Sequence, residues 1–518
     1  MHNGYNSGTA PFNRSGWPAH VEATARPLGP KAWPLDKAQW LPTVPPASPA
    51  CAKPGQCGAP QPVQLVPHGG TALRIGTLPL SGADALHKAH KSDDNAAVAS
   101  PDPLEAEIQD YIDQLARNFS IGVGVGYVDA HGRQLSLGAG GIGVDGTVVL
   151  GSGTKPYVAA AVMRLVERGV VVLDDKAMEH VDVPLRSIWG TSFVALFGPM
   201  AADVTVEQLM RHTSGLGDFD EVSSYEDGVL QNFTANPAHA VHDPMEDMLI
   251  VANFSEPFGC TTRNCTWVFA PGSGGHLYYS SLNFILSGLV LLAHAPAQHN
   301  SWRTMDMPAL LGFKPEQYQH TFFPALGALN TSGLSTVGYT GTDFGGPTTV
   351  FSQDASIMGF CYGYVVASAG DVARFYWAML NPAKAGTVLS LKSVKAMTTW
   401  DLIDRGWGAG RVLYGIGLEL ECATNGQGPG GSGEKPCSSA NLTAGIGHAG
   451  TTYGFQSINH YYPHLERAIS ITLNCDSGWS AKARHSSRCI AKRIIMCNVL
   501  RIALRHQGAG APDVQCAD

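Results

Sequence analysis

One apolar helix, predicted from Pro156 to Gly169, opens directly after the segment Gly151-Ser152-Gly153-Thr154-Lys155. Its apolar residues recur at helical spacing, and Gly169 stands where a helix commonly ends. Ser152 and Lys155 are three residues apart, so on a helix they share one face and the lysine amine can reach the serine oxygen. The segment therefore predicts a core helix that carries a hydroxyl and an amine side by side at its start.

This pairing suggests a nucleophile and its base. A serine hydroxyl is a poor nucleophile until a neighbour takes its proton, and a lysine whose pKa is lowered by burial can be that neighbour. The pattern alone is weak, because Ser432 and Lys435 repeat it within a loop-like stretch rich in Gly, Pro and Ser. On the first segment alone, Ser152 as a helix N-cap beside an incidental lysine is an equally good interpretation.

The composition limits the classes of function. Of the 518 residues, 44% are hydrophobic and 15% are charged, which predicts a well-buried globular protein. The net charge of −8 argues against nucleic acid as a partner, since phosphate binding needs a basic surface. The apolar stretch from Phe284 to Ala293 is too short to span a bilayer.

The eleven cysteines include three locally close pairs, namely Cys51 with Cys57, Cys260 with Cys265, and Cys422 with Cys437. Their spacing differs from that of a zinc site and is more typical of disulfides in loops. Asn-x-Ser/Thr sequons begin at Asn13, Asn118, Asn232, Asn253, Asn264, Asn330 and Asn441. Together these features favour a secreted or lumenal glycoprotein, although the given start shows no signal peptide.

The chain is expected to have three parts. Residues 1–103 are rich in Pro, Ala and Gly and predict an irregular N-terminal extension, residues 104–505 form the folded domain, and residues 506–518 are a C-terminal tail. Within the domain we expect helices over 104–119, 284–290, 371–380 and 481–504, a hairpin over 121–140, and strands over 454–459 and 468–474. Strands at both ends with helices between them imply one sheet closed by both termini.

Several further motifs follow the first in a fixed order. After Ser152 and Lys155 come Leu173-Asp174-Asp175, His212-Thr213-Ser214-Gly215-Leu216, Pro271-Gly272, Tyr279-Ser280-Ser281-Leu282-Asn283, Ser368-Ala369-Gly370-Asp371 and His448-Ala449-Gly450. In this order the chain resembles the β-lactamase-related serine hydrolases, which include class C β-lactamases, D-Ala-D-Ala carboxypeptidases, D-aminopeptidases and related carboxylesterases. The resemblance covers about residues 104–505. It implies a mixed α/β (α+β) fold, with an antiparallel sheet flanked by helices, a mostly helical second region, and the active site between them.

The resemblance assigns three catalytic residues. Ser152 would be the acylated nucleophile, Lys155 the amine that assists its deprotonation, and Tyr279 the tyrosine of the second motif, which shares the acid–base work. An unperturbed tyrosine has a pKa of about 10, so Tyr279 needs a nearby cation, for which Lys155 is the obvious candidate. The backbone N–H groups of Ser152 and Thr451 would form the oxyanion hole.

The remaining site residues would bind substrate. His448, Gly450 and Thr451 belong to the third motif, where His448 would offer a donor or a positive charge to a substrate carboxylate or carbonyl. Ser281 stands where many relatives carry Asn, which normally helps to hold the substrate amide and the lysine. A serine is shorter and has one hydroxyl in place of the amide. This departure weakens the case for β-lactam or peptide turnover more than the case for acyl transfer.

We therefore predict a serine hydrolase that acts through an acyl-enzyme on an ester or amide bond of a small molecule or peptide. The resemblance implies neither a metal nor an organic cofactor. A carboxylesterase, rather than a peptidase or β-lactamase, is one alternative. The other is a non-catalytic scaffold or binding protein that keeps the fold, which the long extension, the glycine-rich insertions and Ser281 motivate.

Overall fold

The computed structural model describes residues 102–221, 241–259, 265–314, 316–339, 350–384, 387–423, 436–475 and 492–507, together with Val514 and Cys516. All of them belong to one compact unit, Asp93–Asp518. The extension predicted over residues 1–103 lies outside the described residues apart from its last two. The second Ser-x-x-Lys match, at residues 432–435, also lies outside them.

Most of the helices lie in the middle of this part of the chain, and most of the strands lie toward its two ends. The helices are α2 (Pro103–Phe119), α3 (Lys155–Glu167), α4 (Ala177–Trp189), α5 (Phe193–Phe197), α6 (Val206–Met210), α8 (Pro244–Ala252), α9 (Leu282–Ala293), α10 (Met307–Leu311), α11 (Ala369–Leu380), α12 (Leu391–Met397) and α13 (Lys492–Arg505). Short 3-10 helices that matter below are η3 (Gly151–Thr154) and η5 (Phe219–Glu221). Within the described ranges, no helix has both the length and the apolar composition needed to cross a bilayer.

The centre of the unit is an antiparallel sheet of eight described strands in the order β2-β1-β11-β10-β9-β8-β7-β6. These strands are β1 (Val123–Val128), β2 (Gln134–Ala139), β6 (Asp401–Leu402), β7 (Leu413–Tyr414), β8 (Glu419–Cys422), β9 (Ala444–Thr452), β10 (Phe455–Tyr462) and β11 (Arg467–Leu473). The first strand pairs with the last, with Val123 opposite Leu473 and Val128 opposite Ala468. The sheet predicted from the two ends of the domain is therefore confirmed.

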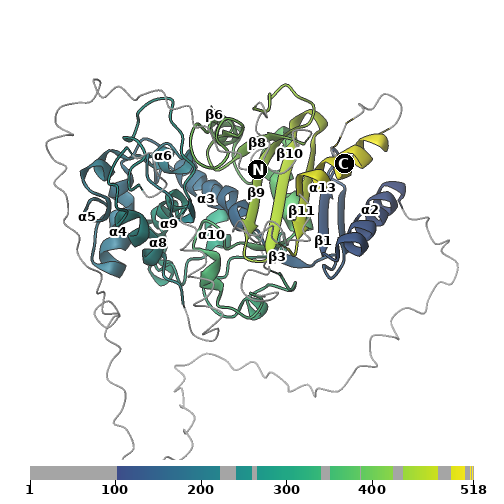
Figure 1. Ribbon diagram of the computed structural model, residues 1–518, viewed down its shortest axis with the longest axis horizontal. Helices are drawn as coiled ribbons and strands as arrows, with labels where there is room; N and C mark the ends of the chain where they lie inside the picture. The colour runs from purple at the N-terminus through teal and green to yellow at the C-terminus, as the bar shows by residue number, and fades with distance from the viewer. Residues whose placement is uncertain are drawn as a thin grey trace, which may run out of the picture. The chain divides into compact units, whose positions relative to one another are not determined.

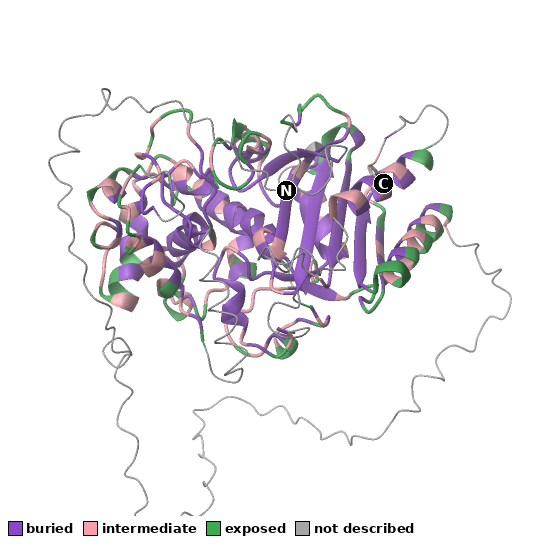
Figure 2. Ribbon diagram, in the orientation of Figure 1, coloured by how far each residue is buried: buried purple, intermediate pink, exposed green. Residues whose placement is uncertain are grey.

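Helices cover both faces of this sheet. On one face α2 and α13 pack against β1, β10 and β11, and on the other α11 packs against the same strands. In a strand that is covered on both faces, successive residues are all buried, whereas in a strand covered on one face buried and exposed residues alternate. Accordingly, every residue of β10 and β11 is buried, and Figure 2 shows the central strands purple along their length while α2 is green on its outer side.

A mostly helical region adjoins the sheet and holds most of the remaining core. Figure 1 shows α4, α5, α6, α8 and α9 grouped beside the sheet, with α3 lying between this group and β9. The apolar helix α9 is buried over nearly its whole length and packs against α3, α4 and α6. A small second sheet has the order β3-β5-β4 (Thr147–Val149, Val366–Ser368, Thr321–Phe322), and its strand β3 directly precedes the turn that carries Ser152. The mixed α/β fold with a helical second region is confirmed.

Disulfides follow the prediction in part. Cys422 and Cys437 are bonded, as their spacing predicted, and Cys265 is also disulfide-bonded. The sequence did not indicate the bond between Cys497 of α13 and Cys516, which joins the predicted C-terminal tail to that helix. Cys51, Cys57 and Cys260 lie outside the described residues.

Candidate active site

Two glycines let the turn with Ser152 lie directly against strand β9. Gly151 has a φ of +57°, and a Cβ atom on it would lie 2.7 Å from the carbonyl oxygen of Thr451. A Cβ atom on Gly450 would lie only 1.8 Å from the carbonyl oxygen of Leu150. Only glycine fits such backbone approaches. The η3 turn and the third motif on β9 are therefore in contact, and Ser152 lies at their junction.

Lys155 lies in the first turn of α3, one turn beyond Ser152. Its Nζ lies 3.0 Å from Ser152 Oγ, 3.4 Å from Ser281 Oγ and 3.3 Å from the carbonyl oxygen of Tyr362. The side chain is fully buried (0% exposed). Burial lowers the pKa of Lys155 to about 8, against the opposing effect of the carboxylates of Asp220, Asp218 and Glu419. A neutral amine is thus accessible near neutral pH.

Tyr279 approaches Ser152 from the other side. Its hydroxyl donates to Ser152 Oγ at 2.9 Å. Its ring packs against the His212 ring, with 4.4 Å between the two centroids, and Lys155 Nζ lies 4.9 Å from the centroid of the Tyr279 ring. Burial raises the pKa of Tyr279 well above its usual value of 10. The nearby lysine therefore does not make this phenol acidic as the sequence led us to expect, and Tyr279 is a hydrogen-bond donor in the free protein.

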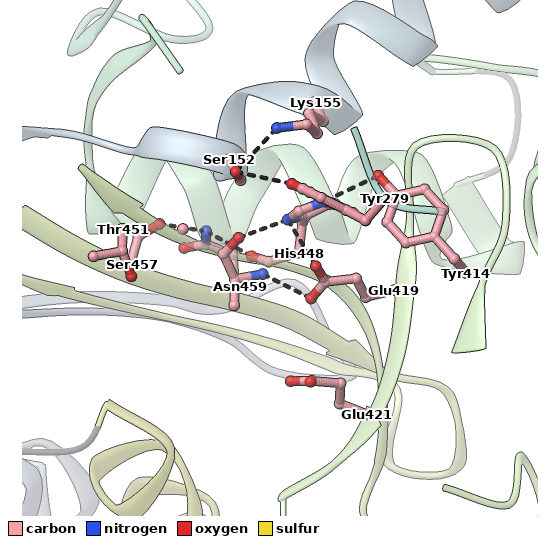
Figure 3. A network of polar contacts seen from close by, with 12 residues as sticks. Ser152, Lys155, Tyr279, Tyr414, Glu419, Glu421, His448, Thr451, Ser457 and Asn459 are labelled. Atoms are coloured by element: carbon pink, nitrogen blue, oxygen red, sulfur yellow. Dashed lines mark hydrogen bonds and ion pairs between the residues drawn. The ribbon is translucent and has the colours of Figure 1, made fainter. Parts of the chain in front are cut away.

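The ring of His448 lies near that of Tyr279, with 6.2 Å between the centroids (Figure 3). Its Nε2 lies 3.0 Å from the Tyr414 hydroxyl, and its Nδ1 lies 2.6 Å from the Ala449 carbonyl oxygen and 3.2 Å from Glu419 Oε1. The side chain is 0% exposed, and burial together with Lys155 holds the pKa of His448 well below 6.5. The imidazole is therefore neutral and has no exposed surface in this structure.

Ser281 is also fully buried. Its Oγ donates to Asp220 Oδ2 at 2.5 Å and lies next to Lys155 Nζ, while its backbone N–H donates to Asp218 Oδ1 at 3.0 Å. Of the four residues predicted to bind substrate, Gly450 is buried as well, and Thr451 is partly exposed. The structure thus brings Ser152, Lys155, Tyr279 and Ser281 together and places Thr451 at the rim.

The segments over residues 212–216 and 279–283 are bound to each other by buried hydrogen bonds. His212 Nδ1 accepts from the backbone N–H of Ser280 at 3.2 Å, and Ser214 Oγ donates to Asn283 Oδ1 at 2.7 Å. Ser280 Oγ donates to the carbonyl oxygen of Gly217 at 2.7 Å. These contacts fix the start of α9, and with it Tyr279 and Ser281. His212 therefore has a structural role.

Four polar residues of the site were missed from the sequence, namely Asp218, Asp220, Tyr414 and Glu419. The two aspartates follow the His212 motif directly, and this proximity was the only available sign. Tyr414 and Glu419 lie on strands β7 and β8, which have two and four residues and show no clear periodicity. Over the residues that the structure describes, no group of three His, Cys, Asp or Glu side chains could hold a metal ion.

The chain is similar in sequence to known proteins. A family model described as Beta-lactamase matches residues 112–488, which is more than half of the chain. Penicillin-binding protein 4 of Amycolatopsis lactamdurans is 27% identical over 307 residues, which cover 56% of this chain and 69% of that protein.

Two solved structures show a similar fold at low sequence identity. A D-stereospecific amidohydrolase from Streptomyces sp. has a TM-score of 0.54 and 21% identity, and the match covers 74% of this chain and 97% of that one. The D-amino acid amidase from Ochrobactrum anthropi SV3, complexed with L-phenylalanine, has a TM-score of 0.55 and 18% identity, over 79% of this chain and 100% of that one.

Proposed function

The chain belongs to the beta-lactamase family, a family of hydrolases, and from this premise we propose that it is a serine hydrolase acting through an acyl-enzyme on Ser152. One observation carries the proposal. Ser152 Oγ lies 3.0 Å from a buried lysine amine and 2.9 Å from a tyrosine hydroxyl. A hydroxyl held between a proton acceptor and a proton donor is the arrangement that nucleophilic catalysis requires.

The proposed reaction begins when neutral Lys155 takes the proton of Ser152 as Oγ attacks the substrate carbonyl carbon. The backbone N–H groups of Ser152 and Thr451 stabilise the oxyanion that forms. The position of the Thr451 backbone beside Gly151 supports this pairing. When the bond to the leaving group breaks, that group receives a proton from Tyr279, and protonated Lys155 gives up its extra proton to replace the one that Tyr279 lost. A water molecule then attacks the acyl-enzyme with the same lysine as base, which releases the acid and regenerates Ser152.

For the substrate we propose an amide or ester of a small molecule or short peptide. The names of the relatives, a D-amino acid amidase, a D-stereospecific amidohydrolase and a penicillin-binding protein, favour an amide. The replacement of Asn by Ser281 leaves the carboxylesterase alternative open, because the site lacks an amide that would orient a peptide bond.

A fluorophosphonate probe tests the nucleophile. We expect covalent labelling of Ser152, and no labelling of the Ser152→Ala variant, with a known serine hydrolase as positive control. Absence of labelling in the unmodified protein would favour the non-catalytic alternative. Turnover of a short-chain aryl ester, a β-lactam and a D-Ala-containing peptide would then separate the substrate classes.

We further propose that the protein is a glycoprotein of the secretory pathway. The sequon asparagines Asn118, Asn253, Asn330 and Asn441 are exposed, and the structure describes two disulfides, which form in oxidising compartments. Expression in a secreting eukaryotic cell should give a product whose gel mobility increases after removal of N-linked glycans. An unchanged mobility would contradict the proposal.

A further inference from the structure

Ser281 has one hydroxyl hydrogen, and the structure directs it away from the catalytic lysine. Ser281 Oγ donates this hydrogen to Asp220 Oδ2 at 2.5 Å. The same oxygen lies 3.4 Å from Lys155 Nζ, and the serine side chain is fully buried, so it is held between these two groups. With its hydrogen committed to Asp220, Ser281 can meet Lys155 only as an acceptor.

This matters because a neutral amine has two N–H donors and one lone pair. Three oxygens surround Lys155 Nζ, those of Ser152, Ser281 and the Tyr362 carbonyl. The carbonyl can only accept, so it takes one N–H. If Ser281 Oγ accepts the other N–H of Lys155, the lone pair of the amine points at Ser152. Ser152 is the residue whose hydroxyl proton Lys155 must take in the proposed reaction.

We propose that Asp220 is a positioning residue that, by accepting the Ser281 hydrogen, directs the lone pair of Lys155 toward Ser152. The inference rests on the proposed role of Lys155 as the base. Without Asp220, the Ser281 hydroxyl is free to donate its hydrogen to Lys155 and compete with Ser152 for the lone pair. Many proteins of the family carry an Asn at the position of Ser281. This chain would use Ser281 and the carboxylate of Asp220 together in its place.

Asp220 also acts on Lys155 through its charge. Among the described residues, the titratable groups near the amine come from several elements. They are Asp218, directly before η5, Asp220 of η5, Glu419 of β8, Tyr279, Tyr362 and the two neutral histidines His212 and His448. Asp220 is the largest of the effects that raise the pKa of Lys155 against burial. Removal of Asp220 should therefore have two separable consequences. The lone pair of Lys155 is no longer directed toward Ser152, and the pKa of Lys155 falls further.

The test measures the rate constant of Ser152 labelling by a fluorophosphonate between pH 6 and 10. For Asp220→Ala we expect the plateau rate at high pH to fall by about tenfold or more, and the midpoint of the pH profile to move to lower pH. Asp220→Asn keeps an accepting oxygen without the charge, so its plateau should stay within a few-fold of the unmodified protein while its midpoint moves as in Asp220→Ala. An unchanged Asp220→Ala plateau, or an equal loss in both variants, would overturn the proposal.

A double-mutant cycle separates this role from a merely structural one. In a Ser281→Ala background, Asp220→Ala should change the plateau rate by no more than about twofold, because the hydrogen that Asp220 holds is gone. Independent, additive losses would contradict the proposal. Glu167→Ala is the matched control. Like Asp220, Glu167 accepts a hydrogen bond from a serine hydroxyl, that of Ser393 at 2.6 Å, but it lies at the end of α3 opposite to Lys155. Its removal should leave the labelling rate and the midpoint of the pH profile unchanged.

A second readout does not depend on catalysis. In protein labelled with ¹³C at the lysine ε-carbon, the Lys155 signal, assigned by its loss in Lys155→Met, should titrate at lower pH in Asp220→Ala than in the unmodified protein. An unmoved titration would contradict the electrostatic part of the inference. Failure of the unmodified protein to react with any probe would instead refute the proposed function, so the two failures are distinguishable.

Discussion

Ser152 Oγ lies 3.0 Å from Lys155 Nζ and 2.9 Å from the Tyr279 hydroxyl, and burial acts on these neighbours in opposite ways. Burial disfavours the charged form of each group, which makes the lysine neutral more readily and keeps the tyrosine protonated. In the proposed reaction the lysine is therefore the proton acceptor and the tyrosine the donor. The assignment follows from residue environment rather than from residue type.

This difference predicts the pH dependence of Ser152 labelling. Only the neutral amine can take the serine proton, and the pKa of Lys155 is about 8, so the labelling rate should rise with pH around a midpoint near 8. The measurement is the labelling rate constant from pH 6 to 10, corrected for the Ser152→Ala background. Tyr279→Phe should label more slowly with the same midpoint, because the phenol does not titrate in this range. A rate independent of pH would contradict Lys155 as the base.

The sequence predicted individual residues of the site unevenly. Ser152, Lys155 and Tyr279 lie in short motifs whose spacing within a helix or turn is visible in the chain itself, and the structure brings them together. Asp220 and Glu419 reach the site from separate segments, and their contacts depend on side-chain direction, which the sequence does not encode locally. The burial of His448 was likewise not predictable, since it depends on Tyr279 and Tyr414 packing over it.

Among the elements of the fold, the contact between η3 and β9 determines where Ser152 lies. The turn approaches the strand so closely that a Cβ atom on Gly450 would overlap the Leu150 carbonyl oxygen and lie 2.8 Å from the Gly153 nitrogen. Neither neighbour is a side chain that could move aside. The elements themselves would have to separate.

We therefore predict that Gly450→Ala moves η3 away from β9 and impairs catalysis more than folding. A displacement of about 1 Å in a catalytic group can reduce the rate by about 100-fold, and we expect a loss of that order in Ser152 labelling. The free energy of unfolding should fall by about 1–3 kcal/mol. Gly143→Ala is the control, because no atom lies within 4 Å of its Cβ position. Labelling of Gly450→Ala at the unmodified rate would show that the close approach is unnecessary.

Element prediction succeeded where the periodicity was long. The helices α2 and α11 and the hairpin of β1 and β2 agree with the sequence-based ranges to within a few residues. The strands β6 to β9 were missed. The first three have only two to four residues, too few to show an alternating pattern, and β9 consists largely of Ala, Gly and Thr. These strands extend the sheet beyond β10, and β8 supplies Glu419, so this omission also hid part of the site.

At the scale of the whole unit, the two ends of the domain lie side by side. Strand β1 pairs with β11, and helices α2 and α13 pack on the same face of the sheet. Because the first strand pairs with the last, loss of structure at the C-terminal end should also destabilise the central strands of the sheet. The sequence predicted this closure because the hairpin and the last two strands lie near the two ends of the domain with most of the helices between them, but it could not give the strand order or register.

The bond between Cys497 and Cys516 should therefore stabilise the whole unit rather than the C-terminal segment alone. It closes a loop with a sequence separation of 19, for which the loss of chain entropy predicts about 3 kcal/mol. We expect a Cys497→Ala, Cys516→Ala double variant to unfold in one transition at lower denaturant concentration, monitored by far-ultraviolet circular dichroism. Arg505→Ala, which breaks only the exposed ion pair with Glu107, should cost less than about 1 kcal/mol. If both variants unfolded at the same denaturant concentration as the unmodified protein, α13 would be held by its apolar contacts with the sheet alone.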